Sequence, residues 1–228
     1  MQPYLFPYLG YFQLIQSVDE FIVYDNVQYM KGGWINRNRI LEDGEVNYIS
    51  LPVKKDSYRK FINERYFTDN IEVAKLEILD RIKNQYFNAP YFNSAYNVVS
   101  DILSNKEMNV SSFVDFSIRR ICDYIGINTK IIKSSDLGDF PESKGRDRVV
   151  DICRSVGAKS YINAIGGVDL YDKSWFLDKG IDIKFIKSRN ISYRQFDKDF
   201  IGGLSIVDVM MFNSPGDILK ILDEYDLV

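Results

Sequence analysis

Residues 160–186 read SYINAIGGVDLYDKSWFLDKGIDIKFI, and this stretch decides the fold class. A β-branched run opens it, a helical pattern fills its middle, and the turn at Gly180 leads into a second apolar run. The predicted order is strand Lys130 to Lys133, helix Lys144 to Val156, strand Ser160 to Ile162, helix Leu170 to Asp178 and strand Ile183 to Ile186. Such alternation predicts parallel βαβ units, and therefore an α/β protein whose mostly parallel sheet is flanked by helices.

The pattern changes on either side of this stretch. Upstream, we expect a proline-set loop at the start, a short helix over Tyr11 to Ile15, and strands over Phe21 to Tyr24 and Val46 to Val53. Apolar residues at helical spacing predict three helices within residues 70–126, a helical insertion or subdomain. Two helices, Ser205 to Phe212 and Pro215 to Tyr225, are expected to close one α/β domain over residues 1–228.

Composition excludes several classes of function. The 228 residues include no histidine, which excludes Ser-His-Asp and Cys-His mechanisms and leaves acid–base chemistry to Asp, Glu, Lys, Tyr or a substrate group. A net charge of −3 gives no overall attraction for nucleic acid. Cys122 and Cys153 stand alone in apolar contexts and are interpreted as reduced core thiols. We expect no metal site, no membrane span and a cytoplasmic location.

Three segments carry more polar and aromatic side chains than a core requires. The first is the loop QPYLFPYLGYF at residues 2–12, whose alternative role is to cover a sheet edge. The second is YDNVQYMKGGWINRNRI at residues 24–40, whose alternative is a solvated hairpin. The third joins YINAIGG at residues 161–167 to YRQF at residues 193–196, where the glycine pair is also compatible with an ordinary turn.

The candidate site residues come from these segments. Asp25 ends a predicted strand, where it can orient a hydroxyl or accept a proton, and Lys31 is the second catalytic candidate. Arginines suit phosphate or carboxylate oxygens, Trp34 offers a stacking face, and amides behind a glycine pair can receive an anion. The predicted substrate-binding residues are Gln2, Tyr4, Tyr8, Gln28, Trp34, Asn36, Arg37, Asn38, Arg39, Asn163, Gly166, Gly167, Tyr193, Arg194 and Gln195. Because parallel strands end at one edge of a sheet, we expect these groups to meet there.

The same segments carry a family resemblance. QPYLFPYLGYFQLI, FIVYDNVQYMKGGWINRNRI, LPV, YINAIGG, GIDIKFI, YRQF and LSIVDVMMF follow one another as they do in the WbqC-like family, whose genes lie among those for surface-polysaccharide assembly. Many members have a histidine at or beside the glutamine of the opening motif, and this chain has Gln2. More distantly, the loop between a strand and a helix resembles the opening of HIGH-type nucleotidylyltransferases and pantothenate synthetases, which implies a HUP-like fold.

The resemblance implies a role in O-antigen or related glycan biosynthesis, with transfer of an amino-acyl group, such as glycine, or another acyl group to an amino sugar or sugar nucleotide. Two alternatives stay open. One is an ATP-dependent enzyme that activates an acid and needs ATP and Mg²⁺. The other is a non-catalytic component that binds a sugar nucleotide. The sequence leaves the oligomeric state open.

Overall fold

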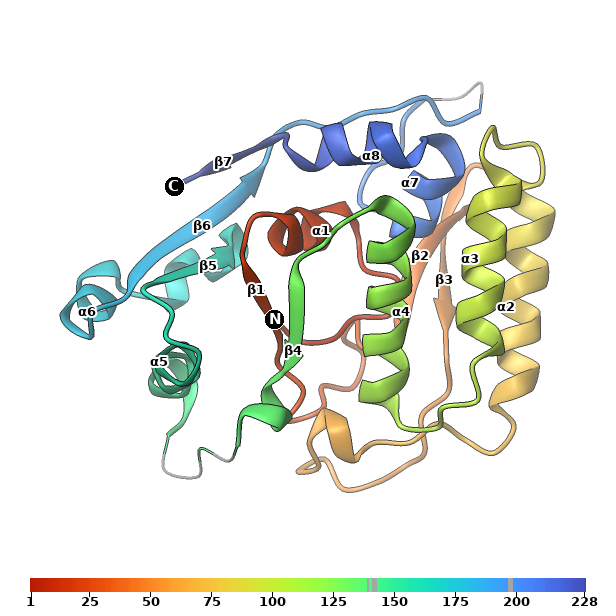
Figure 1. Ribbon diagram of the computed structural model, residues 1–228. Coiled ribbons are helices and arrows are strands. Elements are labelled where there is room, and N and C mark those ends of the chain that lie inside the picture. Colours follow the sequence, from red (N-terminus) through yellow and green to blue (C-terminus); the bar gives the residue numbers. More distant parts are fainter. Residues whose placement is uncertain (139, 141–142, 197–198) are drawn as a thin grey trace.

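The computed structural model describes residues 1–138, 140, 143–196 and 199–228 (Figure 1). The N-terminal part contains α1 (Leu9–Gln16), β1 (Glu20–Val23), β2 (Arg37–Glu42), β3 (Glu45–Ser50), α2 (Ile71–Tyr86), α3 (Phe92–Ser104) and α4 (Val110–Ile125). The C-terminal part contains β4 (Lys130–Lys133), α5 (Gly145–Ser155), β5 (Ser160–Ala164), α6 (Lys173–Asp178), β6 (Asp182–Ser188), α7 (Ile206–Phe212), α8 (Pro215–Leu222) and β7 (Tyr225–Leu227). Short 3₁₀ turns cover Ile62–Glu64, Ser134–Leu137 and Ile165–Leu170.

The strands pair in three small sheets. β1 runs parallel to β4, β5 runs parallel to β6, and β7 pairs antiparallel with the other edge of β6. β2 and β3 form an antiparallel hairpin. The α/β class and the parallel pairing are therefore confirmed, although the ladders of the described residues do not join into one sheet.

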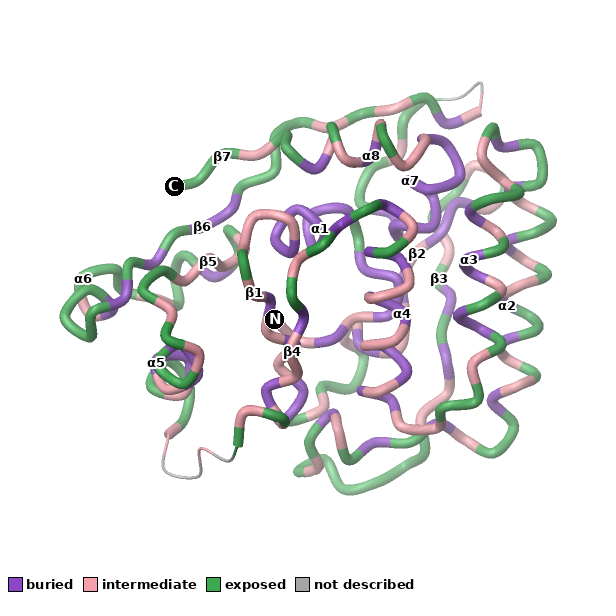
Figure 2. The backbone as a smooth tube through the Cα atoms, in the orientation of Figure 1, coloured by how far each residue is buried: buried purple, intermediate pink, exposed green. Residues whose placement is uncertain are grey.

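The main core lies between the helices and the strands β1, β2 and β4. Figure 2 shows buried backbone concentrated in α1, α4 and α7, while the outer turns of α2 are exposed. Helix α4 illustrates the cause, because Phe113, Ile118 and Ile121 recur at helical spacing and are almost completely buried. Asn109 caps its first turn by accepting a hydrogen bond from Ser112 N at 3.1 Å. Gly126 ends it with a left-handed backbone, φ 94°.

A smaller core holds the segment from α5 to β6. It consists of Val149, Val150, Cys153, Phe176, Ile181, Ile183 and Phe185. α5 and α6 stand apart from the helices α2, α3 and α4 in Figure 1, on the opposite side of the molecule. A cavity lies between this unit and β1.

Several predicted boundaries needed correction. The segment over residues 24–40 was predicted to bind substrate, with a hairpin as the alternative; its last residues do form a hairpin, because β3 pairs with β2 along the whole length of residues 37–42. The helix predicted from Leu170 starts at Lys173, where Asp172 accepts hydrogen bonds from the amides of Ser174 and Trp175. The last helix ends at Leu222, and the chain then extends as β7, pairing with β6.

Candidate functional site

A cavity of about 850 Å³ lies between the chain that follows β1 and the chain that follows β3. These two segments are held together by backbone hydrogen bonds from Tyr29 N to Lys60 O and from Ile62 N to Val27 O. We call this cavity the cationic pocket. Its lining residues are Gln28, Tyr29, Met30, Lys31, Gly32, Asn36, Arg37, Ser50, Val53, Lys54, Lys55, Asp56, Tyr58 and Arg65.

Arg65 forms the buried wall of the cationic pocket and is only 6% exposed. Its guanidinium donates to the carbonyl of Ser57 at 3.1 Å and to that of Lys54 at 2.9 Å. It also stacks over the Tyr29 ring, 4.7 Å from the ring centre. Its Nε has no hydrogen-bond partner among the residues that the structure describes. Arg65 therefore fixes the loop over residues 54–57 and keeps a positive charge inside the wall.

The Tyr29 ring and the Asn36 amide form a second rigid wall. The Tyr29 hydroxyl donates to Asn36 Oδ1 at 2.8 Å, and Asn36 Nδ2 donates to the carbonyl of Leu51 at 2.7 Å. Burial raises the pKa of Tyr29, although the charges of Arg65 and Arg37 act in the opposite direction. Tyr29 therefore remains a neutral hydrogen-bond donor at neutral pH.

Aromatic rings surround the cations at the edge of the β2–β3 hairpin. Arg37 lies over Tyr48, 4.9 Å from the ring centre, and donates from Nε to the carbonyl of Gly33 at 3.1 Å. Trp34 stacks on Tyr48 with ring centres 6.2 Å apart, and Arg39 lies 5.2 Å from the Trp34 ring centre. This arrangement fixes Arg37 at the pocket and makes Trp34 a neighbour of the site.

Charge is strongly unbalanced in the pocket lining. Lys31, Arg37, Lys54, Lys55 and Arg65 are cationic, against the single carboxylate of Asp56. Two of these side chains form ion pairs with residues outside the lining: Lys54 with Asp69 at 2.6 Å, and Asp56 with Lys60 at 2.8 Å. Lys31 and Lys55 form no ion pair with any residue in the described part of the chain. An anion in this cavity would meet several donors at once.

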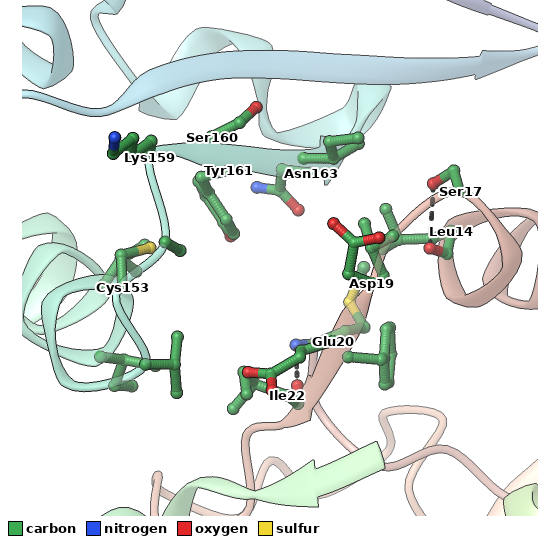
Figure 3. A pocket seen from close by; sticks show the side chains of 18 of the residues that line it. Leu14, Ser17, Asp19, Glu20, Ile22, Cys153, Lys159, Ser160, Tyr161 and Asn163 are labelled. Atoms are coloured by element: carbon green, nitrogen blue, oxygen red, sulfur yellow. Dashed lines mark hydrogen bonds between the residues drawn. The ribbon is translucent and has the colours of Figure 1, made fainter. Parts of the chain in front are cut away.

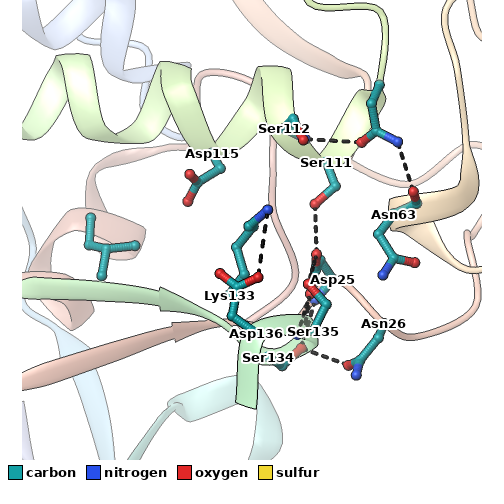
Figure 4. A network of polar contacts seen from close by, with 12 residues as sticks. Asp25, Asn26, Asn63, Ser111, Ser112, Asp115, Lys133, Ser134, Ser135 and Asp136 are labelled. Atoms are coloured by element: carbon teal, nitrogen blue, oxygen red, sulfur yellow. Dashed lines mark hydrogen bonds and ion pairs between the residues drawn. The ribbon is translucent and has the colours of Figure 1, made fainter. Parts of the chain in front are cut away.

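Asp25 lies two residues after the end of β1 and is completely buried. Figure 4 shows its carboxylate between the start of α4 and the end of β4. It accepts hydrogen bonds from Ser111 Oγ at 3.0 Å, Ser135 N at 3.0 Å and Ser135 Oγ at 2.8 Å. Ser134 Oγ lies 3.1 Å from the same carboxylate and 2.6 Å from Asn26 Oδ1. Asp25 therefore joins the chain after β1 to the start of α4 and to the turn after β4. The chain then continues from Asp25 to Gln28 in the lining of the cationic pocket.

Comparison with known proteins gives the family. The model of the WbqC-like protein family matches residues 2–219. The chain belongs to this family. It is also 29% identical over 211 residues to an uncharacterized protein, Rv1507c, of Mycobacterium tuberculosis (strain ATCC 25618 / H37Rv), and the match covers 91% of this chain and 89% of that protein. No solved structure matches the chain.

In this WbqC-like chain the opening loop is anchored from within. Asn38, predicted to bind substrate, is buried and donates from Nδ2 to the carbonyls of Leu5 and Phe6, each at 2.9 Å. Phe6 has a positive φ of 43°, which its carbonyl contacts with Asn38 and with Ser205 Oγ at 2.9 Å hold in place. Asn38 thus supports the opening loop, because both N–H groups of its side-chain amide donate to these two carbonyls.

The predicted residues of that loop lie outside the cationic pocket. Gln2 accepts the Tyr11 hydroxyl on its backbone carbonyl at 3.0 Å, and the Tyr4 ring lies tilted against Tyr11. Tyr8 is 47% exposed and borders a cavity of about 130 Å³ together with Tyr193. Gln2 and Tyr4 therefore contact Tyr11 of α1 and do not line the cationic pocket.

The third predicted segment divides between two places. Asn163 borders the cavity next to β1, with Gly166 exposed and Gly167 buried in the 3₁₀ turn behind it. Tyr193 and Gln195 instead donate to the buried carboxylate of Asp208, both at 2.6 Å. Arg194 next to them is exposed and donates from Nε to the carbonyl of Phe196 at 3.4 Å.

Of the predicted residues, the structure brings Gln28, Lys31, Asn36 and Arg37 into one pocket, with Trp34 beside it. Sequence reasoning missed Arg65, Tyr29 and the lysines of the loop after β3. The available signal was the pair Lys54-Lys55 directly after LPV, but nothing local connects Arg65 with residue 29. The described residues contain no group of three Cys, Asp or Glu side chains that could hold a metal ion.

No helix in the described part of the chain combines the length and apolar character needed to cross a membrane.

Proposed function

We propose that this chain acts in surface-polysaccharide (O-antigen) biosynthesis by binding a sugar nucleotide in the cationic pocket and transferring an amino-acyl or other acyl group to its amino sugar. The observation that carries the proposal is the convergence of five cationic side chains around a cavity of about 850 Å³ whose walls include tyrosines. Family membership supports the same direction. A sugar nucleotide combines a diphosphate with two flat or ring-shaped groups, and this pocket offers partners for both.

The phosphates would occupy the side of the pocket that holds Arg65, Lys54 and Lys55. Charge-assisted hydrogen bonds to phosphate are among the strongest polar contacts in proteins, and each contributes roughly 1.5–3 kcal/mol. Asp56 lies next to these lysines, but its ion pair with Lys60 partly neutralises it. Tyr58 is 71% exposed and offers an open face for a base or sugar ring.

The chemical step would rely on positioning and charge. The amine nitrogen of the sugar attacks the acyl carbonyl carbon, a C–N bond forms, and the bond to the leaving group of an activated acyl donor breaks, with its electron pair leaving on that group. The amine loses one proton to the leaving group or to water. We assign Lys31 to the oxyanion that develops on the carbonyl, because an ammonium group stabilises such charge without itself transferring a proton.

Asp25 takes a positioning role in this proposal. Its carboxylate is completely buried and already accepts hydrogen bonds from the serines of α4 and of the turn after β4. A carboxylate in this state has little access to a substrate proton. It instead fixes the end of β1, from which the chain runs through Gln28 to Lys31.

A fluorescence titration tests binding. The chain has two tryptophans, so a Trp175→Phe variant leaves Trp34, beside Arg37, as the reporter. We expect millimolar or tighter binding of UDP- or dTDP-amino sugars, weakened by salt. A free sugar without phosphate should give no change. No response to any sugar nucleotide at 5 mM, with the protein folded, would contradict the proposal; this concentration is about five times a weak dissociation constant of ~1 mM.

Catalysis needs a separate measurement. The protein is incubated with a dTDP-amino sugar, glycine and ATP, or with an acyl thioester in place of glycine and ATP, and the sugar nucleotide is analysed by mass spectrometry. Acylation should add the mass of the acyl group, and Lys31→Ala should slow it by at least about tenfold. Product only with ATP would favour the acid-activating enzyme, whereas binding without any product would favour a non-catalytic binding component.

A further inference from the structure

A second cavity, of about 630 Å³, lies between the chain around β1 and the chain around β5 (Figure 3). Tyr24, the first residue after β1, lines this cavity together with Tyr161 and Asn163 of β5. Figure 3 shows the Tyr161 ring and the Asn163 amide directed from β5 into the cavity. The cavity shares no lining residue with the cationic pocket, so a role for these side chains goes beyond the proposed function and does not depend on it.

Arg148 of α5 places a positive charge beside this group. Its guanidinium lies over the Tyr24 ring, 5.7 Å from the ring centre, and the side chain is partly buried. Its Nε is buried and has no hydrogen-bond partner, and no carboxylate in the described part of the chain forms an ion pair with Arg148. A partly buried cation without a counter-ion is costly, and an anionic ligand would supply both the missing charge and the missing acceptors.

The tyrosine hydroxyls near Arg148 act as neutral donors. Burial raises the pKa of Tyr24, although Arg148 acts in the opposite direction. Burial and the nearby Tyr171 raise the pKa of Tyr161. Both hydroxyls therefore stay protonated at neutral pH. The Tyr161 ring is fixed by stacking on Phe176, with ring centres 6.1 Å apart, and by an edge contact with Tyr171 at 6.3 Å.

Asn163 is held in one orientation by its neighbours in the chain. Its Oδ1 accepts a hydrogen bond from the N–H of Ala164 at 2.8 Å, so Nδ2 remains as the donor group. A Cβ added at Gly167 would lie only 2.5 Å from Nδ2, which is too close for two such atoms. A Cβ added at Gly166 would meet no atom within 4 Å. The second glycine of the pair therefore preserves the position of the Asn163 amide, and the first does not.

We propose that Arg148 binds the carboxylate of a small organic acid, together with the hydroxyls of Tyr24 and Tyr161. Asn163 Nδ2 completes the set of donors. We call these four residues the acid site. A guanidinium offers one charge and a planar pair of donors, which match the single charge and the two oxygens of a carboxylate. The cationic pocket, with five cationic side chains in its lining, instead suits a diphosphate.

Apolar side chains of α5 favour a carboxylate over a phosphate at the acid site. Val149, Ile152 and Cys153 line the same cavity. They offer a surface for the small apolar group of an organic acid, whereas the second charge of a phosphate ion would lose its water without a second cation to replace it.

A nuclear magnetic resonance titration with acetate tests the proposal, and acetamide, which has the same shape without the charge, is the control ligand. The reporters are the Nε–H of Arg148 and the backbone N–H of Ala164, which donates to Asn163 Oδ1. Acetate should shift both signals with a dissociation constant of about 1–20 mM at constant ionic strength, because so small a ligand makes few contacts. Acetamide should shift neither signal.

The glycine pair supplies matched variants. In Gly167→Ala the new methyl group displaces the Asn163 amide, and acetate should bind at least about fivefold more weakly, because one hydrogen bond to a charged group is lost. Gly166→Ala adds the same methyl group in open space and should change the affinity by less than about twofold. Arg148→Met should abolish the acetate shift at Ala164. Unchanged signals from the main core show that each variant is folded.

Four results would overturn the proposal. The first is no saturable shift with acetate up to about 100 mM, roughly five times the weakest dissociation constant expected. The second is an equal response to acetamide. The third is an equal loss of affinity in Gly166→Ala and Gly167→Ala, since Asn163 would then take no part. The fourth is tighter binding of inorganic phosphate than of acetate, which would exclude a carboxylate as the preferred ligand.

Discussion

The guanidinium of Arg65 lies 4.7 Å from the centre of the Tyr29 ring, although 36 positions separate the two residues in the sequence. This contact joins the chain after β1 to the chain after β3. The hydroxyl of Tyr29 in turn holds Asn36. A charged side chain, an aromatic face and an amide are thereby fixed relative to one another before any ligand arrives, which lowers the cost of binding.

Replacing Arg65 with methionine tests the role of this contact. Arg65→Met keeps most of the apolar stem but leaves the carbonyls of Ser57 and Lys54 without their donors. We expect binding of a sugar nucleotide to weaken by about 10- to 100-fold, since a charge-assisted hydrogen bond contributes roughly 1.5–3 kcal/mol. Titration of Trp34 fluorescence measures the change.

The matched control is Arg59→Met in the same loop. Arg59 is exposed, lies over Tyr58 at 5.6 Å and does not line the cationic pocket. Its replacement should change affinity by less than about threefold, which is the size of a typical exposed ion-pair effect. Equal losses in the two variants would mean that general charge, and not the pocket, attracts the ligand.

Asp25→Asn should destabilise the fold more than its small chemical change suggests. The amide nitrogen would face hydroxyl and N–H donors of Ser111 and Ser135, and a buried unsatisfied group costs about 1–3 kcal/mol. We expect the free energy of unfolding to fall by about 2–4 kcal/mol. Urea denaturation measures this, with Asp123→Asn on the exposed side of α4 as the control. A fully stable Asp25→Asn protein without activity would instead indicate direct catalysis.

Asp208 should produce a measurable pH dependence of stability. Burial raises the pKa of its carboxyl above the ordinary value, although Tyr193, Gln195 and Tyr86 donate to it and act in the opposite direction. The folded state therefore binds the proton more tightly than the unfolded state. As the pH rises from about 4, this group's contribution to stability declines until the folded-state pKa has been passed.

The comparison with Asp208→Asn isolates this effect, because the amide does not titrate. The free energy of unfolding of the natural chain minus that of the variant should decrease between pH 4 and pH 7; each unit of pKa difference corresponds to about 1.4 kcal/mol. Urea denaturation at several pH values measures it. A difference that grows with pH would show that the folded protein lowers the pKa of Asp208.

The two cysteines should be unreactive in the folded protein. Burial raises the pKa of Cys122 to about 12 and that of Cys153 to about 11. The reactive thiolate is therefore scarce at pH 8. Ellman's reagent should label neither residue over minutes in buffer and both in 6 M guanidinium chloride, a concentration above the ~5 M that unfolds very stable proteins. Rapid labelling of Cys153 alone would show that the cavity between α5 and β1, which Cys153 lines, opens readily.

Local patterns in the sequence predicted most of the secondary structure. The helices α2, α3 and α4 follow from apolar spacing, and Gly126 marks the end of α4 as expected. The sequence left residues 24–40 open between a binding segment and a hairpin, because Arg37 and Arg39 suit both; the pairing of β2 with β3 shows that residues 37–42 lie in a hairpin. The α/β class followed from the alternation after residue 130.

The sequence by itself determined which elements form, which chemistry is excluded by the lack of histidine, and the family resemblance. Only the tertiary structure decided which polar residues meet. Asp25 is buried and accepts hydrogen bonds from serines of two elements that are distant in the sequence. The hydroxyl of Tyr193 donates to Asp208, and the guanidinium of Arg65 lies over the Tyr29 ring. Periodicity is encoded over a few residues, whereas these contacts depend on how whole elements pack, and no local pattern specifies that packing.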